Sequence, residues 1–322
     1  MRRYKSFLSS KFQEYITYRK GLGYTDTNLM LSLSYTDRYL NNKELNWDSL
    51  TPSFFLNFRA SLKLNPSTVN GIISTISGFF NYLQRMEFIK ENPLSDIPPI
   101  KEFHFMPFVF TTEQIEQLLI AIQKKIRKEE KYFLSDLAKY VAIVLLARCG
   151  LRISEPTRLL ITHYLPDERT IYIERTKFKK ERLIPIPVRA AAEIDNYLSA
   201  RRSLLNDDNP YLLVVREQKL TRAQLYPVFH QAVKDIGINQ SKKTYANTTF
   251  GSPTPHSLRH AFAINTLGSI KKKGKSPQNA LPILAVYMGH CHYINTAVYL
   301  KMTDPQQCVG LLNFAKNRHL DI

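Results

Sequence analysis

Residues 1 to about 90 carry apolar side chains at intervals of three and four, separated by short polar turns. This period is typical of amphipathic helices. The clearest helix follows Asn65, because Pro66 suits a first helical turn. Its apolar stripe is formed by Val69, Ile72, Ile73, Ile76, Phe80 and Leu83. We expect this stripe to be buried as hydrophobic core, with no role as a binding motif.

Four prolines interrupt the chain after this helical region. They are Pro93, Pro98, Pro99 and Pro107. Because proline lacks an amide donor and disfavours helix, the cluster predicts a linker over residues 92–108. The linker separates a helical domain, residues 1–91, from a larger domain, residues 109–322.

The larger domain mixes helices with two short strands. Thr111 and Gln114 have the spacing of a capping box, and a second helix, about Leu134 to Arg148, should end at Gly150. Residues 170–173 and 183–186 alternate like strands, joined by a basic turn at residues 177–180. Further helices are expected at 188–205, 222–236, 255 to about 269, 280 to about 288, and around 309–317. The fold class is therefore mainly α with a small β-sheet (α+β), in two domains.

The charge of the chain is strongly unbalanced. Lys and Arg number 45 against 27 Asp and Glu, which gives +18 and a pI near 9.7. Up to Phe108 there are 13 basic and 9 acidic residues, or +4, and beyond it 32 and 18, or +14. Such a balance predicts a polyanionic partner, and we expect nucleic acid.

Other features indicate where the protein works. No uninterrupted apolar stretch is long enough to span a bilayer, and the amino end does not resemble a secretory signal, so we expect no membrane association. Cys149, Cys291 and Cys308 lack the paired spacing of a zinc site or a disulfide framework. A reducing compartment, most simply the cytoplasm, is predicted.

Six residues suited to metal-free phosphoryl transfer occur in the larger domain. In chain order they are Arg152, Lys177, His256, Arg259, His290 and Tyr299. Arg152 lies in the segment Gly-Leu-Arg-Ile-Ser-Glu, and the two central residues lie in His-Ser-Leu-Arg-His. A Gly-His pair precedes Tyr299 by nine residues.

Together these motifs resemble the tyrosine recombinase, or phage integrase, family. The amino-terminal helices, the Ser67 to Asn70 helix start and the Asn92-Pro93 exit resemble the family's core-binding domain. The resemblance implies a two-domain DNA clamp, with a SAM-like helical domain and a catalytic domain that ends in a tail helix. It also implies a site-specific recombinase that acts through a 3′-phosphotyrosine and a Holliday junction, with no cofactor and no metal.

The resemblance also implies partners. They are double-stranded DNA with paired recombination sites, three further protomers in a homotetramer joined by exchange of the carboxyl-terminal tail, and an accessory protein. The segments around residues 281–290 look like a transposon-borne or mobile-element branch of the family. Integration, excision or resolution of such an element is the expected role.

Phosphoryl transfer explains why these residue types are needed. Negative charge builds on the phosphorus, and Arg152 and Arg259 supply permanent cations with paired donors. Tyr299 is the expected nucleophile. Lys177, chosen by its family position, would protonate the departing 5′-oxygen, although Lys179 and Lys180 share its turn.

The remaining positions have supporting roles. His256 would accept or relay the tyrosine proton, and His290 would bond a non-bridging oxygen. His260 would support the site, and Glu155 would orient the first arginine or a histidine. Tyr293 is the rival nucleophile, which we expect to pack or to contact backbone. A metal bound by His290, Cys291 and His292 is disfavoured, because adjacent residues rarely converge on one ion.

Two features depart from the family pattern. Arg259 and His290 are 31 residues apart, and the extra length holds the basic segment Lys271 to Lys275, either a grip on DNA phosphates or a solvated insertion. Pro156 interrupts a usual helix, which is tolerated if a helix begins at Ser154.

Two other functions fit some of the same residues. A type IB topoisomerase performs this chemistry as a monomer, and a DNA-binding regulator would keep the fold without activity. The complete set of six residues argues against the regulator, whereas recombination between two sites would separate recombinase from topoisomerase. The apolar residues Val309, Leu311, Leu312 and Phe314 predict a tail helix that must dock on a partner surface. The resemblance implies a pocket on the neighbouring protomer, and packing on its own domain is the alternative.

Overall fold

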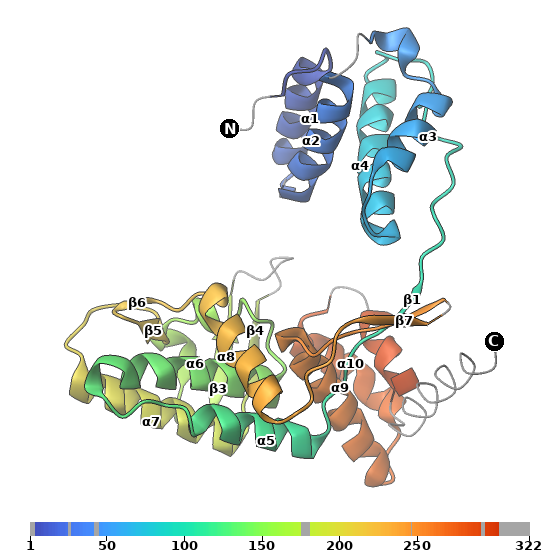
Figure 1. The fold of residues 1–322 in the computed structure, drawn as a ribbon. Coiled ribbons are helices and arrows are strands. Elements are labelled where there is room, and N and C mark those ends of the chain that lie inside the picture. The colour runs from blue at the N-terminus through green and yellow to red at the C-terminus, as the bar shows by residue number, and fades with distance from the viewer. Residues whose placement is uncertain are drawn as a thin grey trace. The chain divides into compact units, whose positions relative to one another are not determined.

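The structure is a computed structural model that describes residues 4–24, 27–41, 45–174, 181–245, 247–290 and 294–302. The chain divides into two compact units, Met1–Phe103 and His104–Ile322 (Figure 1). Both are mainly helical, and the second adds small sheets, so the fold class predicted from the sequence is confirmed.

Unit 1 is a set of helices around an aromatic core. The helices are α1 (Ser9–Gly21), α2 (Thr27–Asn41), α3 (Pro52–Ser61) and α4 (Pro66–Arg85), with a 3-10 turn η1 (Trp47–Ser49). Helix α4 begins after Asn65, as predicted, and all six residues of its predicted stripe are buried. Phe12, Phe55 and Phe79 fill the space between the helices.

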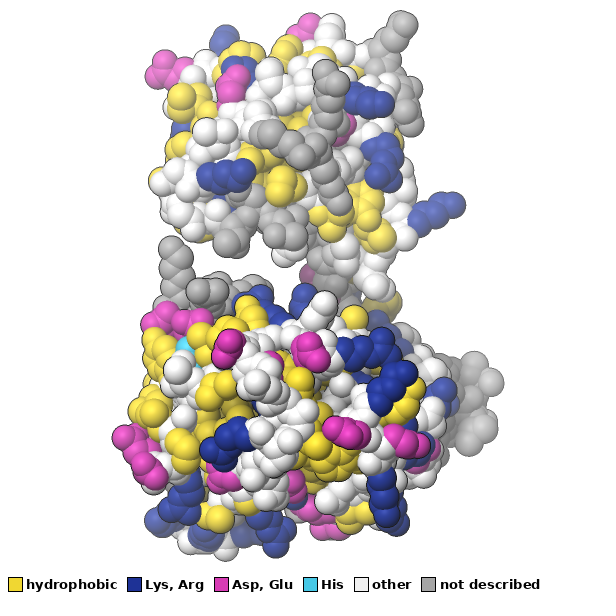
Figure 2. Space-filling view, turned by 90° about the vertical axis from the view of Figure 1, so that its left-hand side faces the viewer, with side chains coloured by type: hydrophobic (Ala, Val, Ile, Leu, Met, Phe, Trp, Pro, Cys, Tyr) yellow, Lys and Arg dark blue, Asp and Glu magenta, His cyan; other side chains and the backbone are white. Residues whose placement is uncertain are grey.

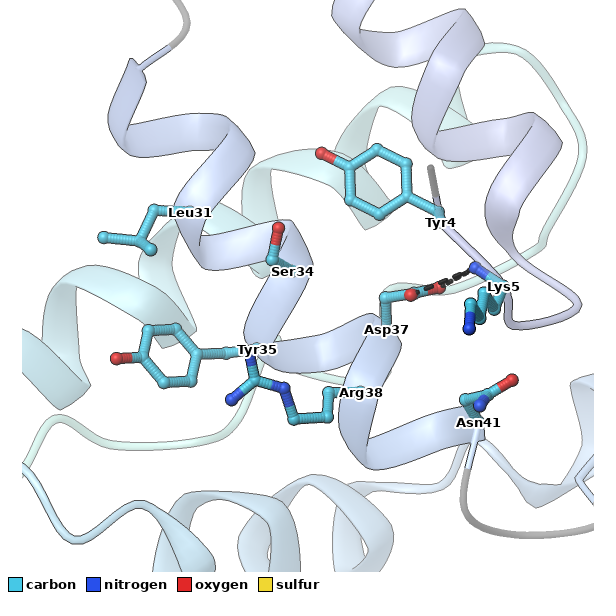
Figure 3. Close-up of a pocket in the computed structure, with 8 residues that line it drawn as sticks. All are labelled: Tyr4, Lys5, Leu31, Ser34, Tyr35, Asp37, Arg38 and Asn41. Carbon is cyan, nitrogen blue, oxygen red and sulfur yellow. Dashed lines mark hydrogen bonds between the residues drawn. The ribbon is translucent and has the colours of Figure 1, made fainter. Parts of the chain in front are cut away.

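Unit 1 also has a hollow beside α2, shown in Figure 3. Its carboxylate, Asp37, accepts hydrogen bonds from the backbone N–H groups of Lys5 and Ser6, at 3.0 and 2.9 Å. These bonds tie the segment before α1 to α2. The buried charge of Asp37 is thus used in holding the fold.

Unit 2 is built around one buried helix. Its helices are α5 (Thr112–Gln123), α6 (Glu130–Cys149), α7 (Val188–Leu204), α8 (Arg222–Asp235), α9 (Pro255–Lys272), α10 (Pro277–Met288) and α11 (Ile294–Ala297), with 3-10 turns η2 (Pro156–Arg158), η3 (Ile161–His163) and η4 (Val298–Met302). Every residue from Tyr140 to Ala147 is buried, and α6 packs on α5, α7, α8 and α9. The capping box at Thr111 and the left-handed end of α6 at Gly150 are both present, as predicted.

Three small sheets complete unit 2. The predicted strands form an antiparallel pair, β3 (Thr170–Ile173) and β4 (Arg182–Pro185), which β2 (Tyr164–Leu165) extends. A two-stranded sheet joins β5 (Val214–Val215) and β6 (Gln218–Lys219). In the third sheet, β1 (His104–Met106) runs parallel to β8 (Thr248–Phe250), which pairs with β7 (Lys243–Tyr245).

Two regions, the predicted linker and the segment around Pro156, are described further by the structure. Residues 104–106, which fall within the predicted linker, form β1, because β8 supplies backbone partners that lie far away in the sequence. Pro156 opens a short 3-10 turn and does not lie in the first turn of an α-helix from Ser154. A pyrrolidine ring fits the start of either turn, so the expected tolerance of Pro156 holds.

One face of each unit carries charged side chains of both signs (Figure 2). In Figure 2, Lys and Arg side chains are spread across the visible face of each unit, with Asp and Glu side chains between them. Across the described residues, no helix is both long and apolar enough to cross a membrane.

Candidate active site

Two helices of unit 2 end beside one another, each at a glycine in the left-handed backbone conformation. Helix α6 ends at Gly150, with φ +59°, and α10 ends at Gly289, with φ +64°. At the end of α10, Gly289 N–H donates to Val286 O and His290 N–H donates to Ala285 O, the pattern of a Schellman motif. The last carbonyls of a helix carry partial negative charge and need other donors. Here arginines supply them.

Three consecutive carbonyls at the end of α10, the third of them just beyond Met288, each accept a hydrogen bond from a different arginine. Arg182 Nε donates to Tyr287 O at 2.7 Å, Arg259 Nη2 donates to Met288 O at 2.5 Å, and Arg152 Nη2 donates to Gly289 O at 2.6 Å. Arg259 also donates to Gly150 O at 2.7 Å, so it bridges the ends of both helices. The two arginines predicted from the sequence are therefore brought together by backbone carbonyls.

Glu155 is the carboxylate of this cluster and is 7% exposed. Its Oε1 accepts from Arg152 Nη1 at 3.0 Å and from Arg182 Nη1 at 3.1 Å. Its Oε2 accepts from the backbone N–H of Arg152 at 2.9 Å and from Arg182 Nη2 at 3.0 Å. Burial favours the neutral acid, but the hydrogen bonds and charge of Arg182 outweigh it and lower the pKa of Glu155. Glu155 is therefore ionised and held from two sides.

Helix α9 brings the next group of predicted residues into the site. It starts after Thr254, whose backbone N–H donates to Ser257 Oγ at 3.1 Å. His256, Arg259 and His260 then lie in its first two turns. Arg259 is 1% exposed. Burial, and next the charge of Arg152, lower the pKa of Arg259 to about 9, so it remains charged at pH 7.

The three histidines of the site are kept neutral. Burial is the main cause for each, and the positive charges of Arg259 and Arg152 act in the same direction for His256 and His290. The pKa of His290 falls to about 4. For His260, burial and then His256 lower the pKa to about 3. A neutral imidazole can accept a proton, which an imidazolium cannot.

Tyr299 lies in η4 and is 5% exposed. Its Oη is 3.0 Å from His260 Nδ1, and its ring lies against that of His290, with centroids 6.3 Å apart. Burial raises the pKa of Tyr299, although the charges of Arg259 and Arg152 oppose the shift. The hydroxyl is therefore protonated before reaction, next to cations that favour its anion.

The two helix histidines differ in their contact with the tyrosine. The sequence assigned the tyrosine proton to His256, but His260 is the residue that contacts the hydroxyl, and the His256 ring meets the His260 ring edge-on with centroids 4.5 Å apart. His290 Nδ1 is 2.7 Å from Thr296 Oγ1, a buried hydroxyl. Thr296 was not predicted from the sequence.

Arg182 was also missed, although the sequence contains a signal for it. Residues 182, 184 and 186 share one face of the β4 region, and Ile184 and Ile186 are buried. A cation at an inward-facing strand position needs a buried partner. Arg182 is 8% exposed and finds that partner in Glu155.

Several predicted residues lie outside the described part of the chain. They are Lys177, Lys179, Lys180, Cys291, His292, Tyr293 and the tail 304–322. Among the described residues, no three His, Cys, Asp or Glu side chains are placed to hold a metal ion.

The basic segment Lys271 to Lys275 is distant from the site within unit 2. It begins in the last turn of α9, while His256 lies in the first turn. At 1.5 Å per residue, the helix separates them by about 24 Å. The segment is exposed and does not take part in the arginine cluster.

Comparisons with known proteins find both a matching family and similar folds. The sequence profile of the phage integrase family matches residues 109–304. The integrase/recombinase-like protein y4rB of Sinorhizobium fredii is 27% identical over 300 residues, which cover 89% of this chain and 90% of that protein. The fold resembles that of the XerH site-specific recombinase in a post-cleavage complex with its difH substrate, with a TM-score of 0.67, 18% identity, and coverage of 87% and 77% of the two chains. It also resembles λ integrase in a tetramer bound to a Holliday junction, with a TM-score of 0.63, 16% identity, and coverage of 88% and 77%.

Proposed function

The chain belongs to the phage integrase family and is a tyrosine-type site-specific DNA recombinase, and on this premise we propose that Tyr299 is its nucleophile. The observation that carries the assignment is the position of the Tyr299 hydroxyl, 3.0 Å from a neutral His260 in a cluster that contains Arg152 and Arg259. A tyrosine there can lose its proton to an acceptor while cations stabilise the charge it gains.

The proposed step exchanges one ester for another. The Tyr299 oxygen attacks the scissile phosphorus and its proton passes to a histidine, with His260 the nearest acceptor. The bond from phosphorus to the 5′-oxygen breaks, and that oxygen takes a proton to become a free 5′-hydroxyl. The 3′-phosphate remains esterified to Tyr299. Because the phosphodiester energy is conserved, attack by another 5′-hydroxyl rejoins DNA without ATP.

The arginines are proposed to stabilise the phosphorane-like transition state. Arg152 is partly open, with 23% of its side chain exposed, and donates only two side-chain hydrogen bonds within the described residues. Its remaining donors suit non-bridging phosphate oxygens. If the Thr296 hydroxyl donates to Nδ1 of neutral His290, the Nε2–H of that ring is left to donate to the same phosphate.

Replacement of Tyr299 tests the assignment. Tyr299→Phe removes only the nucleophilic oxygen, so it should bind DNA as the parent does and form no covalent adduct. The measurement is a gel assay for protease-sensitive protein–DNA adducts on nicked duplexes from the DNA that flanks this gene. Tyr293→Phe is the matched control and should stay active. An adduct that persists in Tyr299→Phe would exclude this nucleophile.

Lys177 is proposed as the acid that protonates the leaving 5′-oxygen. Lys177→Ala should cleave ordinary DNA poorly but recover on DNA whose bridging 5′-oxygen is replaced by sulfur, because a thiolate leaves without a proton. Lys179→Ala and Lys180→Ala are the controls. If one of these recovers on sulfur while Lys177→Ala does not, the acid is that neighbour.

The wider reaction is proposed to be strand exchange between two duplexes for a mobile element. Three features support a DNA-bound tetramer. The chain is basic, and the helical domain of residues 1–91 can provide a second contact with DNA. The fold also resembles that of λ integrase, which forms a tetramer on a Holliday junction. The tail 304–322 is the proposed link between protomers. Truncation after Pro305 should leave binding to single sites intact and abolish pairing of two sites in a mobility-shift assay.

A further inference from the structure

We propose that Arg182 is a positioning residue for phosphoryl transfer, which holds Glu155 and so keeps the charge of Arg152 available to the scissile phosphate. The inference rests on the proposed function, because it concerns the same site. Arg182 is in β4, five residues after Lys177 in the sequence, and is not one of the six predicted residues.

The first argument comes from how Glu155 is shared. Arg182 bonds both carboxylate oxygens with Nη1 and Nη2, at 3.1 and 3.0 Å, in the bidentate geometry that guanidinium and carboxylate prefer. Arg152 bonds the same carboxylate with one side-chain nitrogen. Both partners of the Arg182 pair are 6% exposed at the side chain, so water screens the interaction little. Glu155 is therefore committed chiefly to Arg182.

The second argument is the charge of the site. The described cluster holds three arginines, one ionised glutamate and neutral histidines, for a net charge of +2. Without Arg182 the net charge falls to +1, and Glu155 is left with Arg152 as its nearest cation. A carboxylate paired with Arg152 alone would weaken its attraction for a phosphate. The positive charge of Arg182 therefore offsets the negative charge of the Glu155 carboxylate.

The third argument is that Arg182 also fixes the end of α10. Its Nε donates to Tyr287 O, and its guanidinium lies against Gly289, where an added Cβ would be only 3.0 Å from Nη1. Gly289 O in turn holds Arg152, and His290 follows directly. One side chain thus sets the position of the carboxylate, the helix end and, through Gly289, the first arginine.

The test uses orthovanadate, an oxyanion that adopts the five-coordinate geometry of the transition state, titrated calorimetrically into the full-length protein. Arg182→Met should weaken vanadate binding about tenfold or more, toward the hundredfold range expected for loss of a direct oxyanion donor. The double variant Glu155→Gln/Arg182→Met should recover most of the lost affinity, because a neutral amide no longer competes for Arg152. Recovery of this kind distinguishes positioning from a packing role.

Arg201→Met is the matched control. Arg201 is an equally buried arginine of unit 2 with its own carboxylate partner, Asp207, and shares no bond with the site. It should bind vanadate as the parent does, even if it melts earlier. If Arg182→Met folds poorly, Arg182→Lys is used in its place. It keeps the charge without the paired bonds, so its affinity for vanadate should be lower than that of the parent.

The same variants are then compared for the rate of covalent adduct formation on nicked DNA, where Arg182→Met should lose about tenfold or more relative to Arg201→Met. Parent-like vanadate affinity in Arg182→Met, or a double variant weaker than the single one, would overturn the inference. A parent that forms no adduct would contradict the proposed function, while the vanadate titration would still decide the role of Arg182.

Discussion

Unit 2 contains two clusters of buried arginine that make similar hydrogen bonds but differ in net charge. One surrounds Arg201, and the other lies at the end of α10. Arg201, in the last turn of α7, donates to both oxygens of Asp207 and to the carbonyls of Asn209, Tyr211 and Leu212. All five of its N–H donors are used, and one carboxylate balances one cation. This cluster holds a loop in place, and Arg201 has no free donor with which to bind an anion.

The cluster at the end of α10 is unbalanced by comparison. It holds three arginines and one carboxylate, which bonds two of them, and Arg152 keeps side-chain donors free within the described residues. Helix-end carbonyls hold the cations in place without cancelling their charge, because a carbonyl carries only a partial negative charge. The proposed anion site therefore has fixed cations in excess of their counterions, and the Arg201 cluster does not.

The largest expected effect is on the rate of the reaction, when an arginine of each cluster is replaced by lysine. Arg259→Lys keeps the charge but cannot bridge Gly150 O and Met288 O with two parallel donors, so the rate of adduct formation should fall about hundredfold or more. Arg201→Lys, the matched control, should lower the melting temperature and leave the rate of the folded protein unchanged. Single-turnover cleavage and calorimetric melting on both variants make the comparison. Equal rate losses would show that burial alone, and not charge excess, matters.

The next effect is on stability against pH. His290 and His260 have folded pKa values near 4 and 3, below an unfolded value of about 6.5, so the unfolded chain binds more protons between these limits. Their contribution is complete above about pH 6.5 and is lost as pH falls toward 4, by about 2–4 kcal/mol in total at pH 4.5. His260→Gln should remove part of this dependence in calorimetric melts at pH 7 and 4.5.

The Arg201 cluster should respond in a different pH range. Hydrogen bonds from Arg201 lower the pKa of Asp207, so that pair weakens only as pH falls below the unfolded value of about 3.9. Asp207→Asn should therefore show the same loss of stability between pH 7 and 4.5 as the parent does. If the loss of stability between pH 7 and 4.5 is smaller in Asp207→Asn and unchanged in His260→Gln, it originates in the Arg201 cluster and not in the site histidines.

The smallest effect sharpens the role of the helix end. Gly289 and Gly237 both follow helices with positive φ, but a Cβ at Gly237 meets open space, whereas at Gly289 it meets Arg182. Each alanine substitution should cost about 1 kcal/mol for the left-handed backbone. Gly289→Ala should cost about 1 kcal/mol more for the displaced guanidinium and should slow adduct formation. Denaturant unfolding of the two variants measures the difference, and equal costs would contradict the contact.

The sequence alone determined the parts of this protein that depend on near neighbours. The α4 stripe, the cap at Thr111 and the end of α6 at Gly150 each follow from residues within a few positions of one another. The motif that carries His256, Arg259 and His260 is also local, because three- and four-residue spacing on one helix keeps them near one another. Recognition of the chemistry therefore needed no tertiary information.

Only the tertiary structure decided which partner each of these groups has. Arg182 meets Tyr287 across 105 residues of sequence, β1 finds its partner strand at 248–250, and Tyr299 contacts His260 where the sequence favoured His256. Pattern in the chain cannot choose between such partners, since two histidines one helical turn apart are equivalent until a distant segment packs on one of them. Burial also arises only on folding, and it keeps the histidines neutral, whereas the hydrogen bonds of Arg182 and Arg152 keep the buried Glu155 ionised.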